Sequence, residues 1–178
     1  MNTKNALTLA CLATATLATP VVANAHNYNT VEGGFISRDL GREDDSGLRI
    51  AGSADIARQF ALFGEFSDVG DLDQLTFGGM YHQALQHDLD WYGGVSLEMV
   101  DAGAADDTGI GLRAGLRWTT PDPRFEINPE IRHFEVFDDG VTSLRVAGYY
   151  AITRPFDLQL ALQTGDDDRF EAGARYNF

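Results

Sequence analysis

The sequence has very little of two residue types on which many secreted and nucleic-acid-binding proteins depend. It contains one cysteine, Cys11, and one lysine, Lys4, and both lie in the first 25 residues. Beyond residue 25 the chain therefore has no thiol for a disulfide or a cysteine-based metal site. That part of the chain contains twelve arginines and all 27 acidic residues, which gives it a net charge of −15. This balance argues against binding to nucleic acid through bulk charge.

A long hydrophobic run is also missing. The closest candidate is the mildly apolar segment 6–18, which follows Lys4 and precedes Ala23-Asn24-Ala25. A charged start, an apolar middle and a small-residue cleavage site form the order of a secretory signal. The alternative is an amphipathic or membrane-spanning helix, but the run is shorter than the ~20 residues that a bilayer requires. We predict a cleaved signal peptide over 1–25 and one domain over 26–178.

From residue 28 onward, apolar and polar residues alternate with a period of two, as in strands with one apolar and one polar face. In segment 88–100, for example, Leu89, Trp91 and Val95 alternate with Asp90 and Glu98. Most of the segments are as long as the ~9–11 residues that a tilted strand needs to cross a bilayer. The pattern predicts ten strands, near 28–38, 47–57, 60–68, 73–84, 88–100, 107–119, 124–137, 142–153, 156–164 and 169–178.

Two folds fit this alternation. In a soluble secreted sandwich the apolar faces pack together, whereas in an outer-membrane barrel they face lipid and the polar faces fill the lumen. Glycines inside the predicted strands, such as the pair Gly33-Gly34, favour the bent sheet of a barrel. Aromatic residues favour it too, because those on the apolar faces gather near one set of gaps, as in a membrane-interface girdle. These are Phe60, Tyr81, Trp91, Trp118, Phe125, Tyr150, Phe156, Tyr176 and Phe178.

The C-terminal segment 169–178 is the third feature that favours a barrel. It alternates and ends on Phe178, and so resembles the last strand of bacterial outer-membrane proteins, whose terminal aromatic residue is part of the signal read by the assembly machinery. An ordinary edge strand that ends in phenylalanine is the alternative. Together the three features predict an all-β protein, a ten-stranded antiparallel transmembrane up-and-down β-barrel.

The gaps between the predicted strands alternate in charge. Five acidic gaps hold fifteen of the 27 acidic residues, at 39–46, 68–73, 101–107, 138–140 and 165–168, and the four gaps between them are short and of mixed charge. An even strand number places both termini on the periplasmic side, so the acidic gaps become extracellular loops. Asp166, Asp167 and Asp168, with Asp138 and Asp139, are hard oxygen donors for Ca²⁺ or Mg²⁺. They lack the spacing of a calcium loop, so we expect a solvated rim and no metal site.

Strand parity also predicts which charged side chains enter the lumen. Small barrels are filled by side chains, and arginine can bind two carboxylates at once. We therefore expect a packed ion-pair network, and the alternative is a narrow path for ions or small solutes. The predicted lumen residues are Glu32, Asp55, Glu65, Asp90, Glu98, Glu126, Glu130, Asp157 and Glu171, with Arg49, Arg113, Arg117, Arg132, Arg145 and Arg175.

A lipid-modifying enzyme is a further alternative, because some small outer-membrane barrels act on lipid A. Such a site needs a nucleophile or an activated water next to a base. Only His133 lies near the predicted acidic rim, with Glu135 two residues on and Ser143 on the next strand. Apolar character shifts from Ile131 to Phe134 in this segment, which indicates a strand that leaves the membrane or bulges near His133. We predict no catalytic residue and no cofactor.

Segments 28–35, 94–103 and 175–178, with the ten-segment spacing, resemble a family of small outer-membrane barrels of xanthomonads and other gammaproteobacteria. Some of its members are described as quorum-sensing or diffusible-signal proteins that activate plant immunity. The resemblance extends over most of 26–178 and implies the outer membrane of a Gram-negative bacterium, with release in vesicles, but no ligand. We predict a monomeric, porin-like, non-enzymatic barrel with a structural or surface-interaction role. Its expected partners are outer-membrane lipid, lipopolysaccharide and the assembly machinery, and none is nucleic acid.

Overall fold

The computed structural model of the protein describes residues 26–39, 44–103, 105–137 and 139–178. The predicted signal peptide, 1–25, lies outside these residues. The ten predicted strands are confirmed, and their ends differ from the prediction by at most three residues. They are β1 (Thr30–Asp39), β2 (Asp44–Ala57), β3 (Phe60–Val69), β4 (Leu72–Gln86), β5 (Leu89–Asp101), β6 (Asp106–Thr119), β7 (Phe125–Val136), β8 (Asp139–Thr153), β9 (Phe156–Gly165) and β10 (Arg169–Asn177). Among the described residues, no helix is long and apolar enough to cross a membrane.

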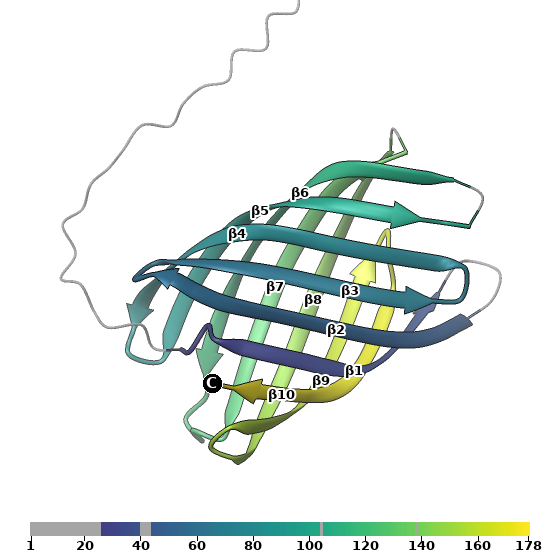
Figure 1. Cartoon of the computed structure of the whole chain (residues 1–178). Helices are drawn as coiled ribbons and strands as arrows, with labels where there is room; N and C mark the ends of the chain where they lie inside the picture. Colours follow the sequence, from purple (N-terminus) through teal and green to yellow (C-terminus); the bar gives the residue numbers. More distant parts are fainter. Residues whose placement is uncertain (1–25, 40–43, 104, 138) are drawn as a thin grey trace, which may run out of the picture.

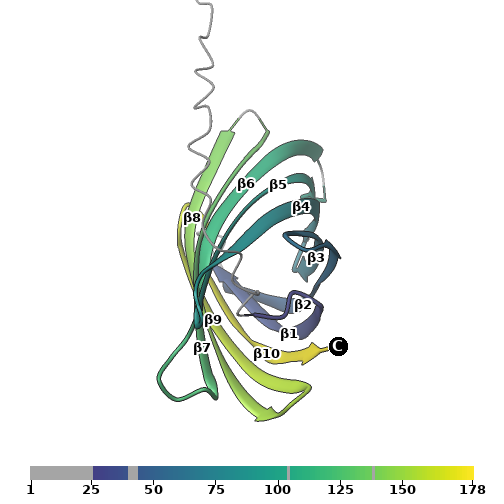
Figure 2. The ribbon, with the colours of Figure 1, turned by 90° about the vertical axis from the view of Figure 1, so that its left-hand side faces the viewer.

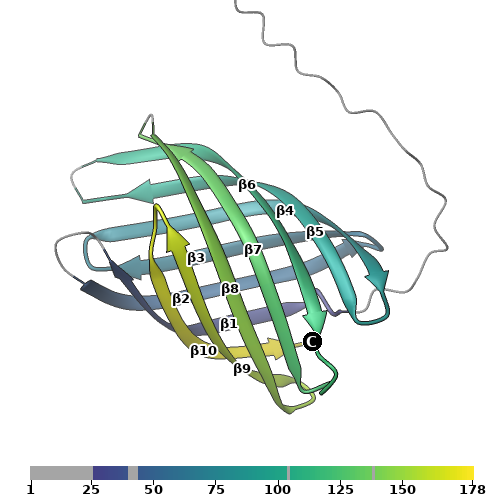
Figure 3. The same ribbon diagram turned by 180° about the vertical axis from the view of Figure 1, so that it is seen from behind.

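The strands form one closed antiparallel barrel. Each strand pairs with its neighbours in the sequence, and β1 pairs with both β2 and β10. Figures 1 and 3 view the barrel from opposite sides, and the strands on the two sides cross at a large angle, as the tilt of barrel strands requires. Figure 2 shows the sheet curving around the lumen. The predicted ten-stranded up-and-down barrel is therefore confirmed.

Glycine permits the close approach of β1 and β10 at the seam of the barrel. Gly34 and Gly173 are partners in the register of these strands. A Cβ atom on Gly34 would lie 2.5 Å from the main-chain oxygen of Ala172, and one on Gly173 would lie 2.4 Å from that of Gly33. Both distances are shorter than van der Waals contact, so a side chain at either position would force the strands apart. Strand-interior glycine here permits the close approach of two backbones.

The surface of the barrel is apolar and its interior is polar, the reverse of a soluble domain. Leu48, Ile110 and Leu162 point outward and are each 65% exposed, whereas His82 and Asp90 point inward and are 0% exposed. Burial along β9 follows a strict period of two. The alternation in the sequence therefore separates an outer apolar face from an inner polar face, as in barrels whose outer face meets lipid.

The predicted aromatic girdle is present on the outer face at the terminal end, near the turns between β2 and β3, β4 and β5, β6 and β7, and β8 and β9. Its rings form three groups of neighbours, with centroid separations between 4.8 and 6.4 Å. Phe60, Tyr81 and Trp91 form one group, Phe125 and Tyr150 a second, and Phe156, Tyr176 and Phe178 a third. Rings on adjacent strands stabilise the sheet through cross-strand contacts.

The two ends of the barrel differ in charge. The Phe178 main-chain nitrogen donates to the Asn29 carbonyl at 3.0 Å, so the end of β10 and the start of β1 lie together. The strand ends that flank the acidic gaps lie at the opposite end (Figure 1). Exposed carboxylates there include Asp68, Asp71, Asp73, Asp101, Asp106, Asp139, Asp166 and Asp168. We call this the acidic end, and the end that holds the termini the terminal end.

Candidate functional site in the barrel lumen

The lumen holds the charged side chains that strand parity predicts, except that Asp55 lies exposed at the terminal end, where it contacts His82 at 2.9 Å. In its middle, Arg49 of β2 donates to Glu32 of β1 and to Glu65 of β3, both at 2.9 Å. Arg132 of β7 reaches the same Glu65 from the far wall at 3.3 Å and also pairs with Glu130 of its own strand. Because β7 and β3 are not neighbours in the sheet, these bonds cross the lumen.

A second set of bonds crosses the middle of the lumen from β8. Arg145 binds Glu171 of β10 at 2.6 Å, and Glu171 lies 3.6 Å from Arg49. The Tyr149 hydroxyl donates to Glu32 at 2.9 Å. Carboxylates therefore sit between guanidinium groups from several strands, an arrangement in which planar arginine forks bind two partners at once.

Nearer the terminal end, Glu126 of β7 joins two arginines. Arg117 of β6 donates to it at 2.8 and 3.1 Å, and Arg175 of β10 at 3.1 and 2.7 Å. Arg175 also donates to Asp157 of β9 at 2.8 Å. The guanidinium of Arg175 lies 3.8 Å from the centre of the Tyr149 ring, close enough for a cation–π contact. Both oxygens of Glu126 are thus occupied by charged donors.

At the acidic end, the structure corrects the expectation of a fully solvated rim. Asp167 is buried, accepts from Arg38 of β1 at 2.6 Å and forms an ion pair with Arg169 of β10. Burial opposes ionisation of Asp167, but Arg169 and Arg38 outweigh it and lower its pKa. Sequence reasoning missed these three residues. Parity could have found Arg38 and Arg169, since they share the inward register of Glu32 and Glu171.

The other two aspartates of that loop accept hydrogen bonds from the main chain. Asp166 accepts from the Thr142 main-chain nitrogen at 2.9 Å, and Asp168 accepts from that of Gly165 at 3.0 Å. In the described part of the chain, no group of three or more acidic, histidine or cysteine side chains is arranged to hold a metal ion. Asp138, the remaining member of the predicted set, lies outside the described residues.

The lumen near the acidic end is narrowed by apolar side chains. Val100, Phe134 and Val136 pack together inside the barrel, with Leu72 and Val141 against them. Strand β7 keeps its register with β8 from Phe125 to Val136. The bulge, one of the two explanations predicted near His133, is therefore absent. The apolar shift marks a change from an apolar outer face to an apolar inner face. Ile131 faces outward and Phe134 faces inward.

The candidate triad does not assemble. His133 pairs in register with Thr142, and its Nδ1 lies 2.8 Å from the Thr142 hydroxyl on the outer face. Ser143 pairs with Arg132 and is buried in the lumen. His133 and Ser143 therefore lie on opposite faces of the sheet. Glu135 is exposed on the same outer face as His133.

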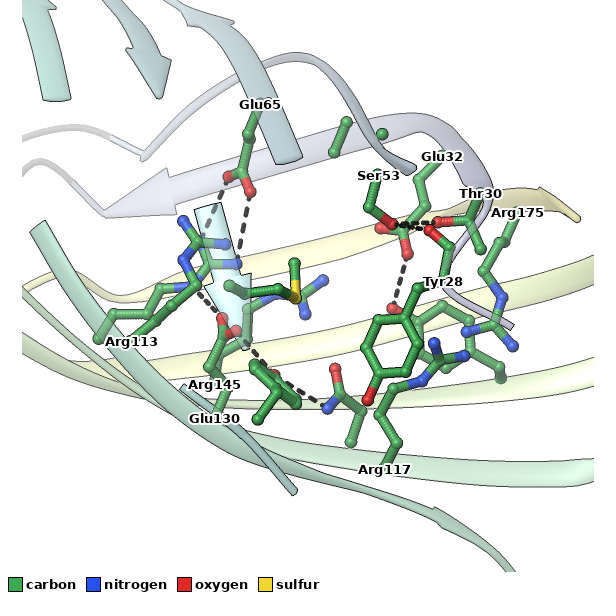
Figure 4. Close-up of a pocket in the computed structure, with 18 of the residues that line it drawn as sticks. Tyr28, Thr30, Glu32, Ser53, Glu65, Arg113, Arg117, Glu130, Arg145 and Arg175 are labelled. Carbon is green, nitrogen blue, oxygen red and sulfur yellow. Dashed lines mark hydrogen bonds and ion pairs between the residues drawn. The ribbon is translucent and has the colours of Figure 1, made fainter. Parts of the chain in front are cut away.

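Little space remains between the lumen side chains. The central cavity measures about 90 Å³, and a second one toward the acidic end about 10 Å³. Figure 4 shows Tyr28 and Arg117 on one side of the central cavity and Glu65, Arg113 and Glu130 on the other. The Arg113 guanidinium lies 4.0 Å from the centre of the Phe63 ring. The central cavity has room for several water molecules, and the second cavity for about one at most.

No protein-family model matches the chain, and no curated protein matches its sequence. Among solved structures, the chain is similar to the KdgM porin, with a TM-score of 0.53 and 12% identity over 84% of this chain and 99% of that one. It is also similar to the KdgM porin in complex with disordered oligogalacturonate, with a TM-score of 0.51, 10% identity and coverage of 84% and 99%. The outer-membrane protein Ail of Yersinia pestis gives a TM-score of 0.48, with 12% identity over 86% and 100% of the two chains.

At these identities the similarity shows the fold alone. The chain has the porin-like β-barrel fold of outer-membrane proteins. The resemblance to the small barrels of xanthomonads has no support from a family model.

Proposed function

We propose that the protein spans the outer membrane of a Gram-negative bacterium as a closed monomeric barrel without catalytic activity. The apolar outer face and its aromatic girdle support this location, because lipid-facing strands have these features. Pairing of β1 with β10 leaves no free sheet edge in the barrel, which supports a monomer. Cleavage of residues 1–25 and recognition of β10, which precedes Phe178, by the assembly machinery belong to the same proposal.

The lumen is closed to solutes in this proposal. One observation carries it: arginines bind carboxylate or amide side chains of non-adjacent strands through much of the depth of the lumen. Arg169 of β10 donates to Gln74 of β4 near the acidic end, Arg132 of β7 reaches Glu65 of β3 in the middle, and Arg175 reaches Glu126 nearer the terminal end. Ion flow would require several of these charge-assisted bonds to break together.

Planar-bilayer recording on the purified, folded protein tests this closed lumen. We expect insertion without stable unitary currents. Heat-modifiable gel mobility of the same preparation confirms that the barrel is folded, and a known porin in the same bilayer shows that the recording detects open pores. Reproducible unitary currents from the folded protein would refute the closed lumen and leave the membrane location standing.

A narrow path for anions or small solutes is the second candidate, and the central cavity favours it. Six arginines line that cavity, namely Arg49, Arg113, Arg117, Arg132, Arg145 and Arg175. The KdgM porin of similar fold has been solved with oligogalacturonate. If unitary currents occur, their reversal potential in a salt gradient would then indicate selectivity for anions.

The acidic end would face the cell exterior, among lipopolysaccharide head groups. Its exposed carboxylates support a surface-interaction role through charge rather than through a built metal site. A calcium titration of the folded protein is therefore expected to leave the melting temperature unchanged, with magnesium as the matched ion. A saturable rise of the melting temperature at micromolar calcium would contradict this part of the proposal.

A further inference from the structure

Residues 26–29 precede β1 and enter the terminal end of the lumen. Tyr28 is 2% exposed, and its ring stacks on the ring of His82 with centroids 3.8 Å apart. The guanidinium of Arg117 lies 4.7 Å from the centre of the Tyr28 ring and donates to the Asn27 carbonyl at 2.7 Å. The Ser53 hydroxyl donates to the Tyr28 carbonyl at 2.6 Å. This short segment, which we call the N-terminal plug, is thus bound by side chains of the barrel wall.

The first residue of the plug lies against a buried carboxylate. The main-chain nitrogen of His26 is 3.2 Å from Oδ2 of Asp90, and Nδ1 of the His26 ring is 3.2 Å from the same oxygen. The ring Nε2 lies 3.0 Å from the Thr119 hydroxyl. Asp90 belongs to β5 and is 0% exposed. His26 therefore lies between Asp90 of β5 and Thr119 at the end of β6.

The charge on the His26 nitrogen depends on whether the chain continues before it. In an uncleaved chain this nitrogen is an amide, a neutral donor. After cleavage it is an α-ammonium, which is positively charged at neutral pH. Burying a carboxylate is costly unless a cation pairs with it, and a charge-assisted hydrogen bond is roughly twice as strong as a neutral one.

We propose that Asp90 is a binding site for the α-ammonium of His26, which removal of the signal peptide after Ala25 creates, and that this ion pair locks the N-terminal plug in the terminal mouth of the barrel. The proposal rests on the signal cleavage included in the proposed function. It also specifies the cleavage position, since a terminus one residue earlier or later would displace the ammonium by up to ~3.6 Å.

The plug also contributes to the central cavity, because Tyr28 lines it. Removal of residues 1–25 would therefore fix the plug in the lumen at the terminal end. At the acidic end, the apolar cluster of Val100, Phe134 and Val136 narrows the lumen.

Amine labelling tests the lock directly, because Lys4 is the only lysine and the mature chain would carry one primary amine. The folded mature protein in detergent is treated with an amine-reactive ester at neutral pH, and mass spectrometry identifies the labelled terminus. A hydrogen bond to a charged group contributes ~1.5–3 kcal/mol, so we expect labelling at least about tenfold slower in the folded than in the urea-unfolded protein.

Two variants distinguish protection of the amine by its ion pair with Asp90 from protection by burial alone. Asp90→Asn removes the counter-charge and is expected to raise the labelling rate at least about fivefold. Asp157→Asn is the matched control, because it removes another buried carboxylate at the same end that binds Arg175 and Asn177 instead. It should remain protected. If Asp90→Asn does not fold, a single glycine inserted before His26 displaces the ammonium without changing the wall and is expected to remove the protection.

The outcomes are distinguishable. A mature chain that begins at a residue other than His26 refutes the cleavage position and the lock with it. A chain that begins at His26 but labels as fast when folded as when unfolded refutes the lock alone. Equal labelling of Asp90→Asn and the parent protein refutes the role of Asp90. None of these results depends on membrane conductance.

Discussion

Replacing Glu126 tests whether the ion-pair network holds the barrel together. Glu126 accepts four hydrogen bonds from Arg117 and Arg175. Glu126→Gln keeps the shape of the side chain, removes the charge and turns an amide donor toward two guanidinium groups. Removing one partner of a buried ion pair costs about 3–5 kcal/mol because the other charge stays buried.

The expected cost lies at the lower end of this range. Arg175 keeps Asp157 at 2.8 Å, and Arg117 keeps the Asn27 carbonyl at 2.7 Å. We therefore expect a loss of about 3 kcal/mol in the free energy of unfolding, more than a hundredfold in the folding equilibrium. Urea unfolding in lipid vesicles, followed by the fluorescence of Trp91 and Trp118, measures it.

A control and a double-mutant cycle complete the experiment. Glu135→Gln removes an exposed carboxylate from the same strand, and it should change the free energy of unfolding by less than about 0.5 kcal/mol. Combining Glu126→Gln with Arg175→Met should cost less than the sum of the two single changes, because the two residues share one interaction. A loss below about 1 kcal/mol for Glu126→Gln, or additive costs, would refute the structural role of the network.

Three further predictions follow from other parts of the barrel. The pKa of Asp167 is lower in the folded state, so its charge stabilises the fold above the unfolded pKa near ~3.9, and this contribution is lost as pH falls through the folded pKa. Asp167→Asn should therefore lower the urea midpoint at pH 7, and the two proteins should converge as pH falls through the lowered pKa of Asp167; parallel profiles would contradict this. Gly34→Ala should impair seam closure, seen as loss of heat-modifiable mobility, whereas Gly33→Ala should not, since a Cβ there meets nothing within 4 Å. His133→Ala and Ser143→Ala should leave the acyl pattern of lipid A unchanged in mass spectra of cells that express the protein, and a changed pattern would restore the enzyme hypothesis.

The strands and the inner and outer faces could be predicted because one physical rule governs both. Successive side chains in a strand point to opposite faces, so the alternation that reveals a strand also assigns its faces. Leu89 and Asp90 illustrate this: the first lies on the outer side of β5 and the second is fully buried in the lumen. The same rule made the outward position of the aromatic girdle predictable.

The alternation of side chains does not apply to the parts of the lumen that the sequence did not predict. Asp167 belongs to a loop, so no parity applies, and its turn toward Arg38 depends on the position of β1 across the seam. The N-terminal plug has no alternation either, and its binding to Asp90 depends on β5. His133 and Ser143 seemed compatible from their residue types alone, and the register of β7 with β8 places them on opposite faces.

The sequence by itself determined the ten strands, their two faces and the charge difference between the two ends, because each follows from the local order of residues. Only the tertiary structure decided which charges meet. Closing β1 on β10 fixes the register around the barrel, and that register brings Glu65 to Arg132, Glu126 to Arg175 and Asp90 to the start of the plug. Contacts across a lumen join residues far apart in the chain, and no local pattern encodes them.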